Sequence, residues 1–168
     1  FYNYVDKGIP PSVASVSSTV DNGSYKAGQV IPITVTFTEE VVVGGTPTLR
    51  LATGADSGAG TAVPYSSGNG TSVLTFNYTV VAGDSSIDLN YVDANSLTLS
   101  DANSITDLSG TRVQLFQDAG RTTPAPPSFG ANAYLPAATD ANSLGNTKTI
   151  KIDTVAPTFA VTYSIATF

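Results

Sequence analysis

Apolar and polar residues alternate along several runs of the chain, and this alternation predicts β-strands with one buried face. From Ile31 to Phe37 every second residue is apolar, and the residues between are proline and threonine. Leu74–Val80, Ile87–Tyr91 and Ile150–Ile152 repeat the pattern. A period of two residues places alternate side chains on opposite faces of a strand. The period of about 3.6 residues that marks a helix is absent, so the chain is expected to be all-β.

Shorter apolar runs and turn sequences complete this pattern. Turns are predicted at glycine-containing sequences such as Asp21-Asn22-Gly23 and Gly68-Asn69-Gly70, because glycine and asparagine tolerate turn conformations. Many short strands with such punctuation are typical of a β-sandwich. The shorter candidate strands are Val13–Val16, Val41–Val43, Leu49–Leu51, Leu97–Leu99 and Val113–Phe116.

The chain is predicted to hold one domain with connecting segments at both ends. Residues 11–153 carry the strand pattern, and residues 1–10 are expected to be a linker or the end of a preceding domain. Pro157-Thr158-Phe159-Ala160 resembles Pro11-Ser12-Val13-Ala14. Residues 154–168 are therefore predicted to be a linker and the first strand of a following domain, as in proteins built from repeated modules.

Composition excludes several classes of function. Hydrophobic residues make up 41% of the chain and charged residues only 12%, so the surface must be mostly threonine, serine, asparagine and glycine. Cys and His are absent, which removes thiol chemistry and the usual base of hydrolytic triads. The net charge of −6, with seven Lys and Arg, disfavours nucleic acid as a partner. No apolar run is long enough to insert into a membrane.

The carboxylates offer no pair for catalysis. Glu39 and Glu40 are the two glutamates of the chain. Adjacent residues of a strand point to opposite faces, so these side chains cannot converge on one glycosidic bond. The chain is accordingly predicted not to be an enzyme, and the two glutamates are expected to discourage aggregation at a strand edge.

A repeated Asp-Ala-Asn-Ser sequence is the candidate metal site. It occurs at Asp93–Ser96, at Asp101–Ser104 and at Asp140–Ser143. Oxygen ligands at alternating positions suit Ca²⁺, and Asp93, Asp101, Asn103 and Asp107 are the predicted ligands. In the alternative interpretation these side chains cap turns through nearby backbone groups, which needs no convergence of ligands.

The segment 118–143 interrupts the rhythm of short strands. It contains four prolines and two aromatic residues, Phe129 and Tyr134. Irregular segments of this length are usually functional or disordered. We expect the segment to pack back on the sheet with Phe129 and Tyr134 as anchors, or else to use these rings as a binding surface.

Several ordered pieces resemble one family, the bacterial Ig-like repeat of large surface proteins and adhesins. The resemblance rests on Tyr25–Glu39, Gly45–Leu51, Gly70–Tyr78, Gly83–Tyr91, Ile105–Gly110 and Asp153–Thr158. It implies an immunoglobulin-like Greek-key β-sandwich and a location outside the cell or on a bacterial cell surface. It also implies that the neighbouring domains of the same chain are partners.

The resulting interpretation is a non-catalytic module of a repeat-built adhesin or fibre, acting as a spacer or adhesive domain. Two alternatives remain. In the first, residues 118–143 recognise a glycan or protein on the surface of a host or prey cell. In the second, the domain is an accessory part of a secreted hydrolase whose chemistry lies elsewhere.

Overall fold

The computed structural model describes residues 10–54, 60–101, 104–113, 132–156 and 158, and within them the chain is all-β, as predicted. One four-residue helix is the only helix in these ranges. The elements in chain order are β1 (Val13–Ser18), β2 (Gly23–Tyr25), β3 (Val30–Val43), β4 (Thr48–Leu51), β5 (Thr61–Ser67), β6 (Thr71–Thr79), β7 (Ser85–Ser86), β8 (Leu97–Thr98), β9 (Ile105–Asp107), β10 (Asn132–Ala133), α1 (Leu144–Thr147) and β11 (Ile150–Asp153).

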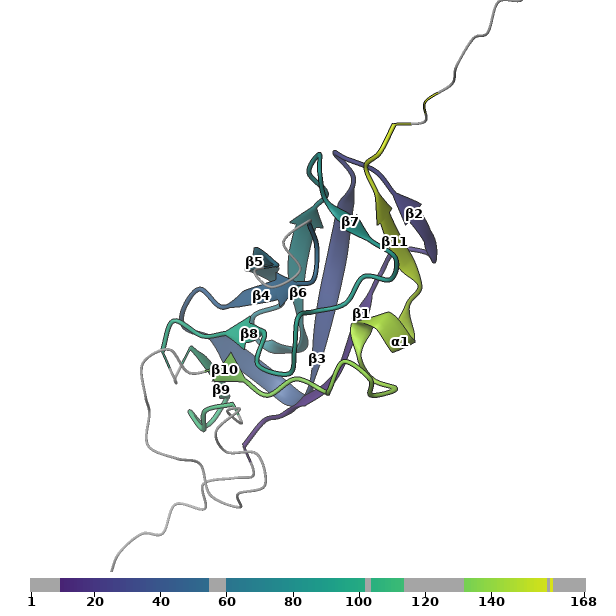
Figure 1. Ribbon diagram of the computed structural model, residues 1–168. Helices are drawn as coiled ribbons and strands as arrows, with labels where there is room; N and C mark the ends of the chain where they lie inside the picture. The colour runs from purple at the N-terminus through teal and green to yellow at the C-terminus, as the bar shows by residue number, and fades with distance from the viewer. Residues whose placement is uncertain (1–9, 55–59, 102–103, 114–131, 157, 159–168) are drawn as a thin grey trace, which may run out of the picture.

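The strands form curled sheets in an arrangement consistent with a β-sandwich (Figure 1). The larger sheet has the order β1-β3-β6-β5-β4-β8-β10, with β9 paired to β3, and the smaller has the order β2-β11-β7. Every pair is antiparallel except β2 with β11. Strand β5 pairs with β4 over Thr61–Pro64 and with β6 at Tyr65 and Ser67. It therefore connects the part of the larger sheet that contains β1, β3 and β6 to the part that contains β4, β8 and β10.

The predicted alternation sets the core. On β3, Ile31, Ile33, Val35 and Phe37 are buried, while the threonines between them are partly exposed. The apolar residues of β6 and β11 are buried in the same way. Fully burying one such side chain contributes about 1.5–3 kcal/mol, so these facing rows account for much of the driving force for folding.

Two predicted details are wrong. Ile87 is 90% exposed, although its alternation partners Leu89 and Tyr91 are buried. Val41–Val43 is not a separate strand but the end of β3, which continues past an irregularity between Thr36 and Val41. Of the candidate strand Val113–Phe116, Val113 is buried, and residues 114–116 lie outside the described ranges.

The predicted turn at Gly68-Asn69-Gly70 joins β5 to β6. A Cβ atom at Gly68 would lie 2.0 Å from the carbonyl oxygen of Val73, and the φ of +110° also favours glycine. Asn69 ties the turn down, since its backbone N–H donates to the Tyr65 hydroxyl and its side-chain oxygen accepts from the Val43 N–H. The turn is therefore fixed to both β5 and β3.

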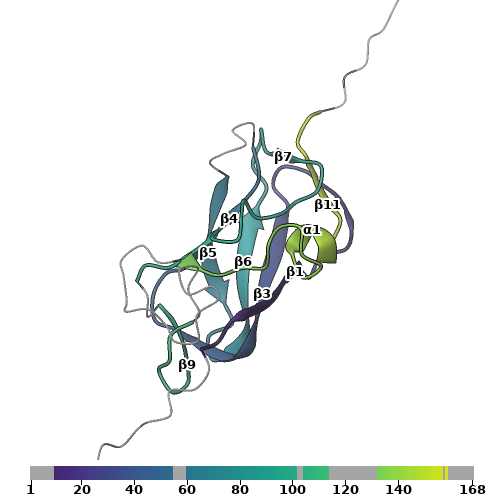
Figure 2. The same ribbon diagram turned by 60° about the horizontal axis from the view of Figure 1, so that its bottom comes forward.

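Strand β3 spans the sandwich from one end to the other. Its fourteen residues extend roughly 45 Å at about 3.3 Å per residue. Ser12, just before β1, exchanges hydrogen bonds with Thr38, which lies past the middle of β3. Near its beginning, residues 28 and 29 bond Val80, close to the point where the chain leaves after β11. The described chain therefore starts and finishes at opposite ends of the sandwich (Figures 1 and 2).

Candidate functional site

The Asp-Ala-Asn-Ser copies form closely similar turns. In the first copy the Ser96 N–H donates to the Asp93 carbonyl at 3.1 Å, and the Asp93 N–H donates back to the Ser96 Oγ at 2.9 Å. In the second copy, Asp101 and Ser104 make the same two bonds at the same distances. In the third copy the Ser143 N–H donates to the Asp140 carbonyl at 2.9 Å.

Each turn ends on a buried serine followed by a buried aliphatic residue. Ser96, Ser104 and Ser143 are all at most 1% exposed. Leu97, Ile105 and Leu144 come next in the chain and are fully buried. The repeated sequence thus forms a turn at the surface, and the residue that follows the turn lies in the core.

The first copy interrupts the pairing of the chain with β4. Leu51 pairs with Tyr91, and two positions earlier Leu49 pairs with Leu97. The chain therefore runs beside β4 at Tyr91 and again at Leu97–Thr98, and Asp93–Ser96 form an excursion between these two points. The other two copies precede β9 and α1, so the turns serve three different connections.

Two of the four predicted calcium ligands, Asp93 and Asp107, hold turns through their carboxylates. Asp93 Oδ1 accepts hydrogen bonds from the Asn95 N–H and the Ser96 hydroxyl, both at 3.1 Å. Asn103 lies outside the described residues. Within the described ranges no group of three acidic side chains is arranged to hold a metal ion. The calcium site stays a prediction, and the turn-capping alternative has the specific hydrogen bonds that it requires.

Asp107 closes a turn of its own at the end of β9. Its carboxylate accepts from the Ser109 N–H at 2.8 Å, the Ser109 hydroxyl at 2.8 Å and the Thr111 N–H at 2.7 Å. Burial opposes ionisation of this side chain, which is 8% exposed, but these hydrogen bonds outweigh it and hold the pKa of Asp107 below its usual value. The Asp107 side chain is therefore ionised, and the hydrogen bonds that it accepts hold the turn after β9.

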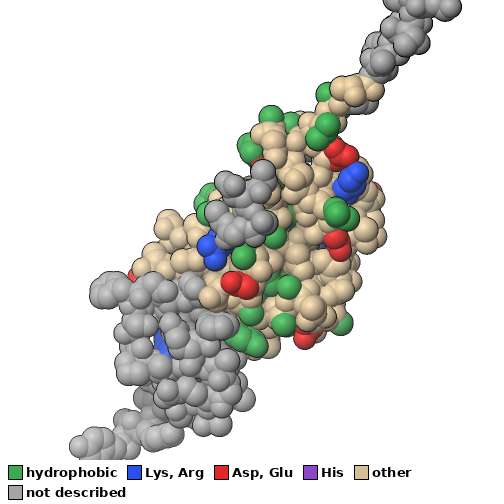
Figure 3. All heavy atoms as spheres, in the orientation of Figure 1, with side chains coloured by type: hydrophobic (Ala, Val, Ile, Leu, Met, Phe, Trp, Pro, Cys, Tyr) green, Lys and Arg blue, Asp and Glu red, His purple; other side chains and the backbone are tan. Residues whose placement is uncertain are grey.

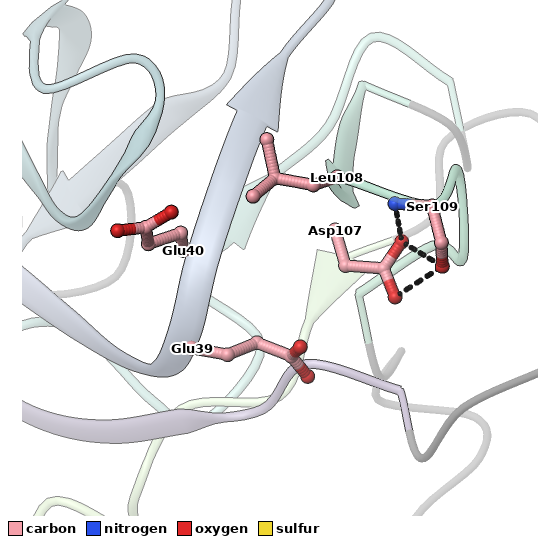
Figure 4. Close-up of a pocket in the computed structure, with 5 residues that line it drawn as sticks. All are labelled: Glu39, Glu40, Asp107, Leu108 and Ser109. Atoms are coloured by element: carbon pink, nitrogen blue, oxygen red, sulfur yellow. Dashed lines mark hydrogen bonds between the residues drawn. The ribbon is translucent and has the colours of Figure 1, made fainter.

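A shallow acidic hollow of about 390 Å³ adjoins this turn. Its lining residues are Glu39, Glu40, Asp107, Leu108 and Ser109. Figure 4 shows the side chains of Glu39 and Glu40 extending from β3 in different directions, with Asp107 turned toward Ser109. The three carboxylates do not converge, so the hollow has no paired acid and base at hydrogen-bonding distance.

The point where the chain leaves the sandwich holds a hydrogen-bonded cluster that the sequence analysis did not single out. The Tyr78 hydroxyl donates to Asp84 Oδ2 at 2.6 Å, and the Val81 N–H donates to the same oxygen at 3.1 Å. Thr154 joins this turn, because its Oγ1 donates to the Asp84 carbonyl at 2.9 Å and accepts from the Gly83 N–H at 3.1 Å.

Burial is the main reason that the pKa of Tyr78 is raised well above its usual value, and the hydrogen bond to Asp84 acts in the same direction. The phenol therefore remains a proton donor at neutral pH. The sequence signals were the Gly83-Asp84 turn and the Asp153-Thr154 pair, which are far apart in the chain. Only pairing of β11 with β7 brings them together.

The second half of the 118–143 segment packs on the sandwich. Ala133 and Leu135 are fully buried, and the Leu135 N–H donates to the Ala94 carbonyl at 2.8 Å. Tyr134, between them, is 37% exposed. Phe129 lies outside the described residues, so the two rings as anchors of the segment stay a prediction. Ala133 and Leu135, which alternate with Tyr134, are buried contacts of this segment that the sequence did not single out.

Comparison with known proteins found no match to this chain among family models, curated sequences or solved structures. Within the described residues, no helix has the length and apolar character needed to cross a membrane.

Proposed function

We propose that this chain is a non-catalytic immunoglobulin-like spacer module of an extended extracellular protein. The observation that carries the proposal is that the described chain begins at residue 10 at one end of the sandwich and leaves after β11 at the other (Figure 1). Modules of this geometry add length when they are joined in series. A chain that entered and left at the same end would fold back on itself.

The pairing of the strands supports the immunoglobulin-like topology. One layer has the order β1-β3-β6-β5, which corresponds to strands A-B-E-D of that fold. The segment from β7 to β8 pairs with β11 at Ser85–Ser86 and with β4 at Tyr91 and Leu97–Thr98, as strand F pairs with G and C. The chain order of these elements also agrees with that correspondence.

The proposal includes one departure from the usual fold. Residues 99–149 lie between the sixth and seventh strands, where a short hairpin would suffice. β10 of this insertion pairs with β8, while β11 pairs with β7. The described part of the insertion thus adds β10 to the edge of the larger sheet and leaves β11 in place beside β7.

Composition supports the extracellular setting and the absence of catalysis. The chain has no cysteine to protect from oxidation and no histidine. Its buried polar groups, such as Asp84, Asp107 and Ser143, are committed to hydrogen bonds that hold turns. These groups stabilise the fold. The proposed function therefore depends on the rigidity of the domain and not on a reaction at these groups.

Small-angle X-ray scattering on two copies in tandem tests the spacer proposal. Residue 156 of the first copy is followed by residue 11 of the second, because Pro157–Ala160 resembles Pro11–Ala14. The proposal predicts a maximum dimension close to twice that of one copy. A tandem no longer than a side-by-side pair would contradict it.

A second candidate, recognition of a cell-surface glycan or protein, is favoured by one observation. Tyr134 exposes part of its ring beside the buried Ala133 and Leu135, which hold its backbone in place. A rigidly held, partly exposed aromatic ring is a common element of binding surfaces. A glycan array with the chain and with Tyr134→Ala tests this: loss of a specific signal in the variant would support recognition over a spacer role.

A further inference from the structure

Exposed valines gather where the chain leaves the sandwich. Val30, Val81 and Val155 are 50%, 54% and 81% exposed. Hydrogen bonds join the segments that carry them, since Val80 bonds residues 28 and 29, and Thr154 bonds the 81–84 turn. Figure 3 shows hydrophobic side chains around this exit. We call these three valines, together with the exposed Lys26 of the adjoining β2–β3 turn, the C-terminal face.

The opposite end of the sandwich has the complementary character. Ser12, where the chain begins β1, bonds Thr38, and Glu39 and Glu40 follow directly. These two exposed carboxylates border the hollow of about 390 Å³, and Leu108 on its rim is 68% exposed. We call Glu39, Glu40 and Leu108 the N-terminal face.

We propose that the C-terminal face of one module seats on the N-terminal face of the next module of the same kind in the chain. The inference rests on the spacer function proposed above and names its partner. The valines of the C-terminal face contact Leu108 and the hollow of the next module. Lys26 lies against Glu39 and Glu40 of that module. Such opposite charges favour one orientation of docking over others.

The path of the chain identifies this occupant. Val155 belongs both to the C-terminal face and to the segment that leaves it, so whatever follows is tethered within a few residues of the face. A tether this short gives an effective concentration of about a millimolar or more, so weak complementarity is sufficient. Thr154 holds the departing segment against the 81–84 turn and fixes the direction in which the next module starts.

The test measures residual dipolar couplings by NMR on the tandem, with each copy labelled separately. Seated modules share one alignment tensor, because they tumble as one body. In the first copy, Val81→Ser combined with Val155→Ser is expected to abolish the common tensor. In the second copy, Glu39→Gln combined with Glu40→Gln is expected to weaken the agreement between the two tensors.

The matched controls place the same substitutions where they face no partner. Val81→Ser with Val155→Ser in the second copy, and the glutamine pair in the first copy, are expected to leave the common tensor intact. Independent tensors in the unmodified tandem would overturn the seating. So would a common tensor that survives the first-copy variant, or amide signals at the two faces that do not shift between the single chain and the tandem.

The outcome separates the seating from the function on which it rests. An extended tandem with independent tensors means that the spacer proposal stands and the seating fails. A compact tandem contradicts the spacer proposal itself. If the valine variants instead abolish binding of the single chain to cells, the face serves an external partner and the proposed seating is wrong.

Discussion

The hydroxyl of Thr154 donates to the carbonyl of Asp84, which lies seventy residues earlier in the chain, at 2.9 Å. The same hydroxyl oxygen accepts the Gly83 N–H, while the Asp84 carboxylate holds the Tyr78 phenol. The segment that leaves the sandwich is thereby connected to the core through two side chains. A spacer that bears load along its length requires such a connection at its exit.

Removing the Thr154 hydroxyl should loosen this exit. Thr154→Ala leaves the Gly83 N–H without its side-chain acceptor, and we expect a loss of about 1 kcal/mol in the free energy of unfolding, the usual net value for one or two hydrogen bonds. Denaturant melts of the variant and the parent chain measure it. Thr154→Ser keeps the hydroxyl and is expected to restore most of the stability, while Thr158→Ala, beyond the cluster, should change nothing.

The Asp-Ala-Asn-Ser turns and the calcium hypothesis make opposite forecasts for one thermal melt. A native state that binds calcium melts at a higher temperature in excess Ca²⁺ than in chelator. The hydrogen bonds that the Asp93 carboxylate accepts favour turn capping, so we expect the two curves to coincide. Ser96→Ala, which removes a buried turn hydroxyl, should cost about 1–2 kcal/mol under both conditions. A calcium-dependent rise that disappears in Asp101→Ala would restore the metal site.

Asp107 should make stability depend on acid. Its pKa is lower in the folded chain than the ordinary value of about 3.9 that it takes when unfolded. Its contribution is therefore complete above the unfolded pKa and is lost as the pH falls through the folded pKa. Urea melts from pH 7 to pH 2 of the parent and Asp107→Asn should differ by about 1–3 kcal/mol at pH 7 and converge at the acid end. A difference in the free energy of unfolding that is the same at pH 2 as at pH 7 would show that it does not come from ionisation of Asp107.

The inserted segment offers a paired test with neighbouring residues. Leu135 is fully buried, and Leu135→Ala should lower the free energy of unfolding by about 2–4 kcal/mol through the cavity that it leaves. Tyr134→Ala should cost less than about 1 kcal/mol, because its ring is partly in solvent. Denaturant melts compare the two. A larger loss for Tyr134 than for Leu135 would show that the ring, and not the aliphatic pair, anchors the segment.

The alternation of apolar and polar residues predicted the all-β class and most of the buried residues. The alternation on β3 and β6 depends only on which neighbours are apolar, and both strands lie deep in the sandwich, so their buried faces were predicted correctly. The prediction for Ile87 failed because strand β7 ends at Ser86 and Ile87 lies in the bend that follows, where alternation no longer holds. Val41–Val43 was separated from β3 because the two charged glutamates, Glu39 and Glu40, interrupt the alternation and resemble a strand boundary.

The hydrogen-bonded clusters depend on pairings that sequence spacing does not encode. Thr154 meets Asp84 only after β11 pairs with β7, and the turn after β9 lies near Glu39 only after β9 pairs with Val41–Val43. The repeated Asp-Ala-Asn-Ser sequence was visible, and its turn role was foreseen as an alternative. Its buried serines were not, because a serine is usually an exposed residue.

The most direct test of the account is the distance between the two ends of the sandwich in the intact chain. The absence of cysteine allows nitroxide labels at Ser12→Cys and Val155→Cys without other changes. Ser12 bonds Thr38, and the eight positions along β3 from Thr38 back to Val30, at the C-terminal face, already span roughly 26 Å. Double electron–electron resonance should therefore give a single narrow distribution above about 25 Å. A distance below about 15 Å, less than half the length of β3, would place both ends together and contradict the spacer.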